Sequence, residues 1–580
     1  MHYTRAFTFC KDIFIRSGDE WIENQYRGGG NLLAKAPLWW HIGFFFFVCL
    51  YAFLVVYRAT FSVIDDHTLT QTLLIGQHID FFILPNIGRF YPLDGQDLNL
   101  LSAAFGAKAA VFYAFNALCV FVVIFVLRYA MRVFIAHILE SASSSHKVYA
   151  MQKIPYVVDI LLVLLLLSPS FISSWLRLFV PERMEFVFLS LFLMSYAFVL
   201  ESKNTRASSL MLLVGLVCAN VSLYYKETTF AMIIAFAFVH LFCVYFSHTK
   251  CKIHIRLFDI GLILSAIVWF VVYVFVVLLQ KDDSGFYGDT PYSALLVFVK
   301  SIFTYLCNEP FLCGIILSAL LYRIYAVLRD KQPFIPLLDA SIWGSAILLC
   351  EYVVLKLASH HYLLPAYVFA LIVIGASFLL WWQYKWYKVI FALCAFMFVG
   401  NTLFVSAYVW AHYKFIPPNF QATLSFVSDY THIHSHNRIF LEGVDRVSNV
   451  EVYHSFGRWL TYYGAQDFDL YSSDVVDSRF ASRFNGNAHW SVFKNNEAIA
   501  KQSGDLVIVT PYSAYNFDLE SLSEKYELLF SAEQGYNVPL LGLKTFLKVA
   551  LQFLGLTQGD MILSQNVYGL PLHFYVLRVR

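Results

Sequence analysis

The chain has 580 residues, of which 59% are hydrophobic and only 14% are charged, and its formal net charge is +2. Soluble domains carry charge on about 25% of their residues, so most of this chain is expected to contact lipid rather than water. The sequence has no basic block and no interleaving of basic and aromatic residues, so it gives no indication of a nucleic-acid partner.

Long apolar stretches dominate the first 410 residues. A membrane span needs about 20 consecutive, mostly apolar residues, and eleven such stretches follow one another. We interpret residues 1–37, which are charged throughout, as a cytoplasmic segment before the first span. We expect 292–309 to be an interfacial or re-entrant helix. The predicted spans are 38–57, 106–131, 154–172, 184–200, 208–224, 228–247, 257–279, 310–328, 335–357, 362–382 and 388–410.

Lysine and arginine indicate the orientation of these spans, because they gather in cytoplasmic loops. With the N-terminus inside, every basic cluster falls on the cytoplasmic side: 128–153, 203–206, 250–256, 323–331 and 385–388. The outer side then receives the loops 58–105, 173–183, 225–227, 280–292 and 358–361.

The tail from 412 to 580 has ordinary polarity and lies on the outer side in this topology. Its runs "NRIFLEGV", "DLVIVTPY" and "HFYVLRVR" are typical of strands and predict an α/β domain. The stretch "VPLLGLKTFLKVALQFLG" is amphipathic and is expected to lie on the membrane surface. The predicted organisation is a cytoplasmic segment (1–37), a transmembrane domain (38–411) and an extracytoplasmic domain (412–580).

The outer loops are poor in lysine and arginine, so their few cations are informative. Arg89, Arg177, Arg183 and Lys226 each lie near a predicted membrane boundary, beside a carboxylate or an aromatic residue. Cations that lie against the positive-inside trend need an anionic partner. The phosphate of a lipid carrier fits that depth.

Five carboxylates share this outer face: Asp65, Asp66, Glu182, Glu185 and Glu227. Ionisable groups at membrane depth are costly and indicate function. A carboxylate can accept the proton of an attacking hydroxyl group, and positioned cations can stabilise a leaving phosphate. The adjacent Asp65 and Asp66 could also share a divalent cation such as Mg or Mn. The alternative is an ordinary solvated loop.

The order of these motifs resembles that of the GT-C glycosyltransferases, membrane enzymes that use polyprenyl-phosphate sugars. The acidic pair follows the first span, and "GRFYPLDGQDLN" leads into a second span that contains an asparagine. "VPERMEFVF" opens the fourth span, and "YYKETTF" separates the fifth from the sixth. The similarity is greatest to the tetratricopeptide-type O-mannosyltransferases and their bacterial relatives. "HHYLLPAY" is a weaker match.

This resemblance implies a role for each matched residue. Asp65 or Asp66 would be the catalytic base, and the other would position the acceptor or hold a metal. Arg89, Arg183 and Lys226 would bind the donor phosphate. The residues implied to support the site are Glu182, Glu185, Glu227, His361 and Tyr362.

The implied reaction is transfer of a sugar from an undecaprenyl-phosphate-type donor to a glycan, lipid or protein acceptor, with inversion at the anomeric carbon. It would take place on the periplasmic face of a bacterial inner membrane. Two other functions remain open: a polymerase or ligase that uses lipid-diphosphate oligosaccharides, and a transporter or flippase. Transporters place polar groups near mid-bilayer, whereas most spans here have apolar centres.

Overall fold

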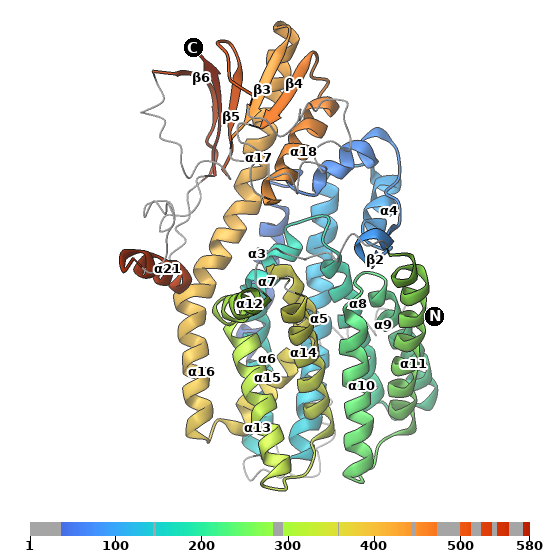
Figure 1. Cartoon of the computed structure of the whole chain (residues 1–580). Coiled ribbons are helices and arrows are strands. Elements are labelled where there is room, and N and C mark those ends of the chain that lie inside the picture. The colour runs from blue at the N-terminus through green and yellow to red at the C-terminus, as the bar shows by residue number, and fades with distance from the viewer. Residues whose placement is uncertain are drawn as a thin grey trace.

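The computed structural model describes residues 36–142, 147–281, 294–355, 357, 359–442, 447–472, 499–511, 524–535, 542–555 and 572–580. Most of the predicted cytoplasmic segment, residues 1–35, lies outside the described residues. The described chain forms a long helical bundle, with a smaller sheet domain at one end (Figure 1).

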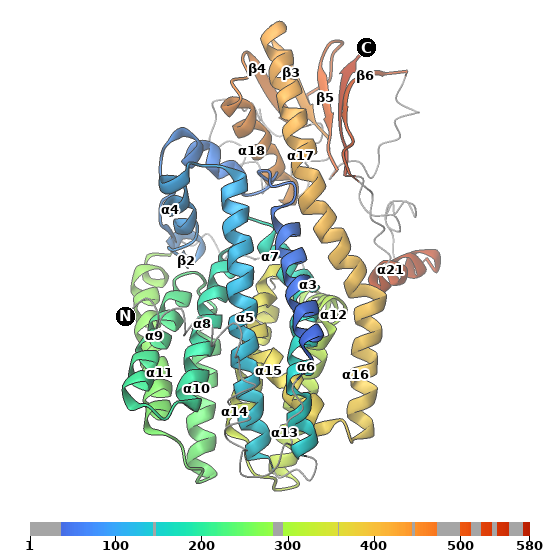
Figure 2. The ribbon, with the colours of Figure 1, turned by 180° about the vertical axis from the view of Figure 1, so that it is seen from behind.

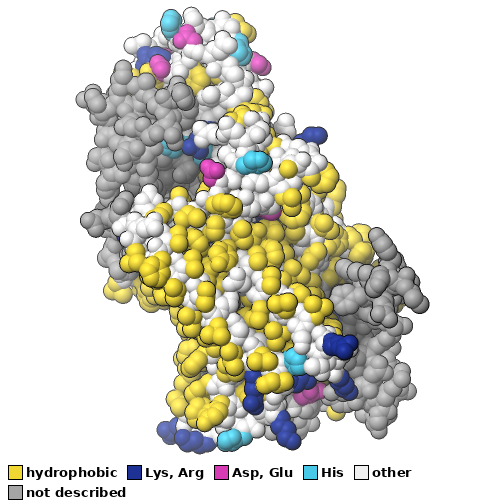
Figure 3. All heavy atoms as spheres, turned by 90° about the vertical axis from the view of Figure 1, so that its right-hand side faces the viewer, with side chains coloured by type: hydrophobic (Ala, Val, Ile, Leu, Met, Phe, Trp, Pro, Cys, Tyr) yellow, Lys and Arg dark blue, Asp and Glu magenta, His cyan; other side chains and the backbone are white. Residues whose placement is uncertain are grey.

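Among the described residues, the structure confirms eleven helical segments that are long and apolar enough to cross a membrane. Helices suit this setting because they satisfy their own backbone hydrogen bonds. A broad apolar band covers the face of the bundle that Figure 3 shows, and lysine and arginine gather at the lower end of that face. The segments are α3 (Leu38–Val56), α5 (Ala109–Ser141), α6 (Lys147–Leu166), α8 (Pro181–Glu201), α9 (Thr205–Leu223), α10 (Thr229–Phe246), α11 (Ile253–Val276), η5–α13 (Phe311–Leu328), α14 (Pro336–Val354), η6–α15 (His360–Trp381) and α16–η7–α17 (Lys385–Ile433).

Shorter helices connect the spans. α12 (Ala294–Asn308) lies across the direction of the bundle and is seen end-on in Figure 1. α21 (Leu543–Phe553), which falls in the stretch predicted to be amphipathic, also lies crosswise, against η7 (Phe398–Thr402). α4 (Gln96–Phe105) and α7 (Pro169–Trp175) belong to the connections at the upper end of the bundle.

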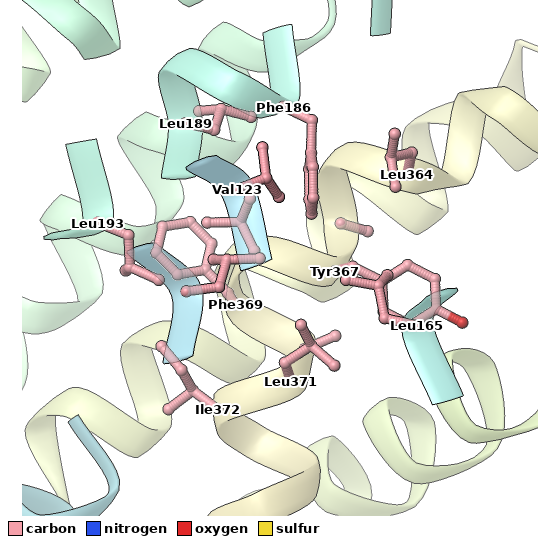
Figure 4. Close-up of a cluster of buried hydrophobic side chains, with 14 of the residues drawn as sticks. Val123, Leu165, Phe186, Leu189, Leu193, Leu364, Tyr367, Phe369, Leu371 and Ile372 are labelled. Carbon is pink, nitrogen blue, oxygen red and sulfur yellow. The ribbon is translucent and has the colours of Figure 1, made fainter. Parts of the chain in front are cut away.

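The centre of the bundle is built around α15. Its Phe369 and Leu371 lie in a cluster with Val123 of α5, Leu165 of α6 and Phe186 of α8 (Figure 4). Where lipid surrounds a bundle, close packing of side chains replaces water exclusion as the main force between helices. This packing holds the upper ends of α5, α8 and α15 in a fixed relation, and these ends carry the polar residues described below.

The sheet domain confirms the predicted α/β character of the tail. Its five strands have the order β4-β3-β5-β7-β6. β3 is parallel to β4 and β5, whereas β7 is antiparallel to β5 and β6. The three predicted runs contain β3, β5 and β7. The strands are β3 (Asn437–Leu441), β4 (Phe468–Ser472), β5 (Leu506–Val509), β6 (Tyr526–Ala532) and β7 (Phe574–Val579).

Two helices join the sheet domain to the bundle. α17 (Leu403–Ile433) runs without a break from the bundle to the sheet, across the predicted boundary at 411/412 (Figure 2). Its buried Lys414 donates a hydrogen bond to the carbonyl oxygen of Val55, at the end of α3 (2.6 Å). α18 (Val447–Tyr462) packs on η1 (Asp66–Gln71), where Arg458 Nη1 lies 2.7 Å from His67 Nδ1. The sheet domain therefore supports the first outer loop directly.

Close packing of α8, α9 and α11 makes Gly215 a sensitive position. A Cβ atom there would lie 2.2 Å from Phe258 Cζ and 2.9 Å from Ser195 Cβ. The Phe258 ring cannot retreat, because it is buried 5.0 Å from the ring of Tyr196. We expect Gly215→Val to destabilise the bundle by about 1–3 kcal/mol and to lower its melting temperature in detergent. Gly43→Val is the matched control, since a Cβ at Gly43 meets nothing within 4 Å. Equal melting temperatures for the two variants would contradict this packing.

Candidate functional site

Four connections meet at the upper end of the bundle, which we call the site end. They are 57–108, 176–180, 224–228 and 355–359, with adjoining helix ends. The opposite end, which carries the gathered lysine and arginine residues, is called the basic end. The residues predicted to form a site all belong to the site end.

The two adjacent aspartates have different surroundings. Asp65 has a left-handed backbone conformation (φ 69°), and its side chain is 35% exposed and pairs with Arg177. Asp66 is only 1% exposed and accepts a hydrogen bond from the backbone N–H of Ser62 at 2.6 Å. Burial raises the pKa of Asp66 to about 7, because it penalises the charged carboxylate. Asp65 is therefore open to a substrate, whereas Asp66 is enclosed in its loop.

Arg177, which follows α7, joins two separate parts of the site. Its Nη2 contacts Asp65, and its Nη1 lies 3.4 Å from Nδ1 of His361 in η6 (His360–Ala366). The side chain of Arg177 is 18% exposed. Arg177 thus lies between Asp65 of the first loop and His361 of η6, which the resemblance implied to support the site.

Lys226 forms a buried pair with Glu182. The distance from Lys226 Nζ to Glu182 Oε1 is 2.7 Å, and Nζ lies 4.6 Å from the ring centre of Tyr362. Both charged side chains are almost fully enclosed. One helical turn further along α8, Glu185 accepts a hydrogen bond from Thr229. Lys226 thus pairs with Glu182 and not with Glu227, its neighbour in the sequence.

Arg183 is held inside the bundle by two partners. Its Nη1 donates to Asn116 and its Nη2 to Asp97, each at 2.5 Å, and the side chain is 1% exposed. Nearby, burial and the charge of Asp97 raise the pKa of Asp94 to about 8. Asp94 and Asp97 are three residues apart in "PLDGQD", at the start of α4.

Arg89 and Glu227 form the fourth pair of the site. Arg89 Nε lies 2.5 Å from Glu227 Oε1, and the two side chains are 11% and 15% exposed. Arg89 lies in β2 (Arg89–Tyr91), which pairs with β1 (Phe82–Leu84) in a short antiparallel hairpin. Its guanidinium lies 4.7 Å from the ring centre of Tyr91. The hairpin thus positions Arg89 at the site surface.

The structure brings all ten predicted residues to one end of the bundle. It gives each of the four cations its own carboxylate: Arg89 with Glu227, Arg177 with Asp65, Arg183 with Asp97 and Lys226 with Glu182. Asp66 and Glu185 instead accept hydrogen bonds from uncharged groups.

Sequence reasoning missed three participants. Arg177 stood out as an outer cation but received no role, and Asp94 and Asp97 received none. The sequence signal that could have identified Asp94 and Asp97 was their three-residue spacing, a few positions after Arg89. Within the described part of the chain, no group of three or more His, Cys, Asp or Glu residues is arranged to hold a metal ion. A Mg or Mn ion at Asp65 and Asp66 stays a prediction.

No protein-family model and no curated protein sequence matches the chain. Its fold is similar to that of ArnT from Cupriavidus metallidurans bound to undecaprenyl phosphate, with 11% identity, a TM-score of 0.42, and coverage of 86% of this chain and 96% of that one. It is also similar to the Archaeoglobus fulgidus oligosaccharyltransferase tethered with an acceptor peptide, with 10% identity, a TM-score of 0.38, and coverage of 74% and 64%. Both belong to the GT-C superfamily that the motifs resemble. Because these TM-scores lie below 0.5, the proposals below rest on the residues of this chain.

The buried Asp66 makes stability depend on pH. A carboxyl group with a raised pKa keeps its proton longer in the folded chain than in the unfolded one, so its contribution is greatest below about pH 4 and falls as the pH rises to 7. We expect Asp66→Asn to flatten the decline in melting temperature between pH 5 and pH 7. Asp80→Asn, at an exposed aspartate of the same loop, is the control. An unchanged slope in Asp66→Asn would refute this origin.

Proposed function

We propose that the chain is a membrane glycosyltransferase that moves a sugar from a polyprenyl-phosphate donor, of the undecaprenyl-phosphate type, to a glycan, lipid or protein acceptor. One observation carries this proposal: the partly exposed pairs Asp65–Arg177 and Arg89–Glu227 lie at one end of a bundle of spans. They present cations for a phosphate and a carboxylate for a proton at the depth of lipid headgroups.

Asp65 is the base in this proposal, and Asp66 positions it. A general base must come within hydrogen-bond distance of the proton that it accepts. The side chain of Asp65 is accessible, whereas that of Asp66 is buried and holds the backbone of Ser62. Asp66 thereby stabilises the turn that gives Asp65 its left-handed conformation.

Arg177 and Arg89 are proposed to meet the donor phosphate first, because their side chains are the most exposed of the four cations. Lys226 lies behind them. Arg183, which is already held by Asp97 and Asn116, supports the frame of the site. This assignment gives Arg177 the contact role that the resemblance implied for Arg183.

The proposed chemistry joins these parts in one displacement. The acceptor hydroxyl oxygen attacks the anomeric carbon, its proton passes to Asp65, and the bond from that carbon to the phosphate oxygen breaks. The bond electrons leave with the phosphate, where Arg177 and Arg89 stabilise the charge. A phosphate that attracts Arg177 also loosens its pairing with Asp65 and so frees a carboxylate oxygen for the proton. A single displacement inverts the anomeric carbon.

The distribution of charge supports one orientation in the membrane. By the positive-inside rule, the basic end would lie in the cytoplasm and the site end outside. For a bacterial inner membrane, the sheet domain would then lie in the periplasm, next to the acceptor.

The two aspartates should respond differently to the same substitution. We expect Asp65→Asn to lower kcat about 100-fold or more, because the amide cannot accept the proton. Asp66→Asn should keep most activity, because its amide oxygen can still accept the Ser62 N–H. The measurement is transfer of radiolabelled sugar from a defined polyprenyl-phosphate donor by purified protein. Full activity in Asp65→Asn would overturn the assignment of the base.

The two arginines form a second matched pair. We expect Arg177→Gln to raise KM for the donor about tenfold, as loss of a charge-assisted hydrogen bond predicts. Arg183→Gln should mainly lower the melting temperature, because it leaves Asp97 buried without its cation. Donor titrations and melting curves of both variants separate these effects. If Arg183→Gln raises KM while Arg177→Gln does not, the original assignment from the resemblance holds instead.

A further inference from the structure

A groove of about 400 Å³ lies near the basic end, far along the spans from the site end. It is bounded by α10, α13, α14 and Phe334 of the connection before α14. This volume falls within the range of small-molecule and lipid-chain sites, about 300–1,000 Å³. None of the residues in the proposed transfer reaction lines the groove.

The walls of the groove are apolar and face the lipid. Phe238 and Phe242 on α10, Ile324 and Leu328 on α13, and Trp343 on α14 all line it, and all five are exposed in the bundle. The helices that carry them are long and apolar enough to span a membrane. The groove is therefore open toward acyl chains, and one such chain can fill it without exposing its surface to water.

A buried arginine distinguishes this groove from an ordinary gap between helices. Arg323 lines it and is 5% exposed. Its Nε and Nη2 donate to the two carboxylate oxygens of Asp339 at 2.7 and 2.9 Å, and Nη2 also donates to the carbonyl oxygen of Pro333. Asp339 accepts a further hydrogen bond from the backbone N–H of Ile335. Among the described residues, Nη1 has no hydrogen-bond partner, so this guanidinium keeps donors for a ligand.

The surrounding charge favours an anion. Arg329 and Lys331, in the connection between α13 and α14, are both exposed, and Asp330 between them is an exposed carboxylate. Lys250 is exposed in the connection between α10 and α11. Lys252 of the same connection is also exposed. Since Asp339 balances Arg323, the four exposed cations outnumber the one exposed acid in these two connections. Basic pockets between spans on the cytoplasmic side are suited to acidic lipid headgroups.

We propose that this groove binds one anionic phospholipid from the leaflet at the basic end. Its acyl chain lies along the walls formed by α10, α13 and α14, and its phosphate accepts hydrogen bonds from Nη1 of Arg323. The lipid fills a gap in the packing of α10 against α13 and α14. The site is separate from the proposed transfer reaction and does not depend on it.

Native mass spectrometry of the purified full-length protein tests this proposal. The probes are phosphatidylglycerol, phosphatidylcholine and diacylglycerol with the same chains, and inorganic phosphate. We expect one phosphatidylglycerol to bind about tenfold more tightly than phosphatidylcholine, because both carry the phosphate but the choline cation of phosphatidylcholine is repelled by the exposed lysine and arginine side chains. Equal binding of diacylglycerol would exclude a role for Arg323, and equal binding of inorganic phosphate would exclude a role for the chain.

Two matched variants locate the site. Ile324→Trp fills the groove and should abolish the preference for phosphatidylglycerol. Leu321→Trp, which places the same ring at a 60% exposed position of α13 outside the groove, should leave it unchanged. Arg323→Lys keeps a cation beside Asp339 but removes the free guanidinium donors to the phosphate, so it should bring phosphatidylglycerol and diacylglycerol closer in affinity. Melting curves verify that each variant is folded. Wild-type lipid preference in folded Ile324→Trp overturns the proposal.

Discussion

The cost of charge inside a bilayer determines where this chain can place its chemistry. Some of the polar groups that do enter the spans form closed sets, such as Tyr196 and His240, which both bond to Asp259 and so join α8, α10 and α11. Such sets leave few donors or acceptors for a substrate. Reactive groups therefore gather where the spans end, and the core around α15 serves to hold those ends together.

The site end is balanced in charge before any substrate arrives. Its four cations each have a carboxylate, and burial raises the pKa values of two further acids, Asp66 and Asp94, toward neutrality. An entering phosphate adds negative charge to this arrangement. Under the proposed function, these acids can take up protons instead of repelling it. In this proposal, the ion pairs with the more exposed side chains separate first when the phosphate binds, whatever the total number of cations.

Hydropathy and residue spacing predicted the eleven spans, the three strands and the set of acids and bases at the outer boundary. These features follow from length, periodicity and the cost of burying charge, which are readable along the chain. The pairings were not predictable in this way. Lys226 and Glu227 are neighbours in the sequence, yet Lys226 pairs with Glu182 and Glu227 with Arg89. Asp65 meets Arg177, 112 positions away. Which carboxylate pairs with which cation depends on how the helices pack, and no short stretch of sequence predicts that packing.

The contact between α18 and η1 constrains how this protein can diversify. Arg458 reaches His67, and Trp459 lies 5.8 Å from the ring of Phe61, so the sheet domain is part of the support of the acidic turn. Recombination that exchanged the whole domain would therefore disturb the acidic turn that carries the proposed base. Under the proposed function, a change of acceptor is therefore more readily reached by substitutions at β6, which lies at one margin of the described sheet, than by exchange of the domain.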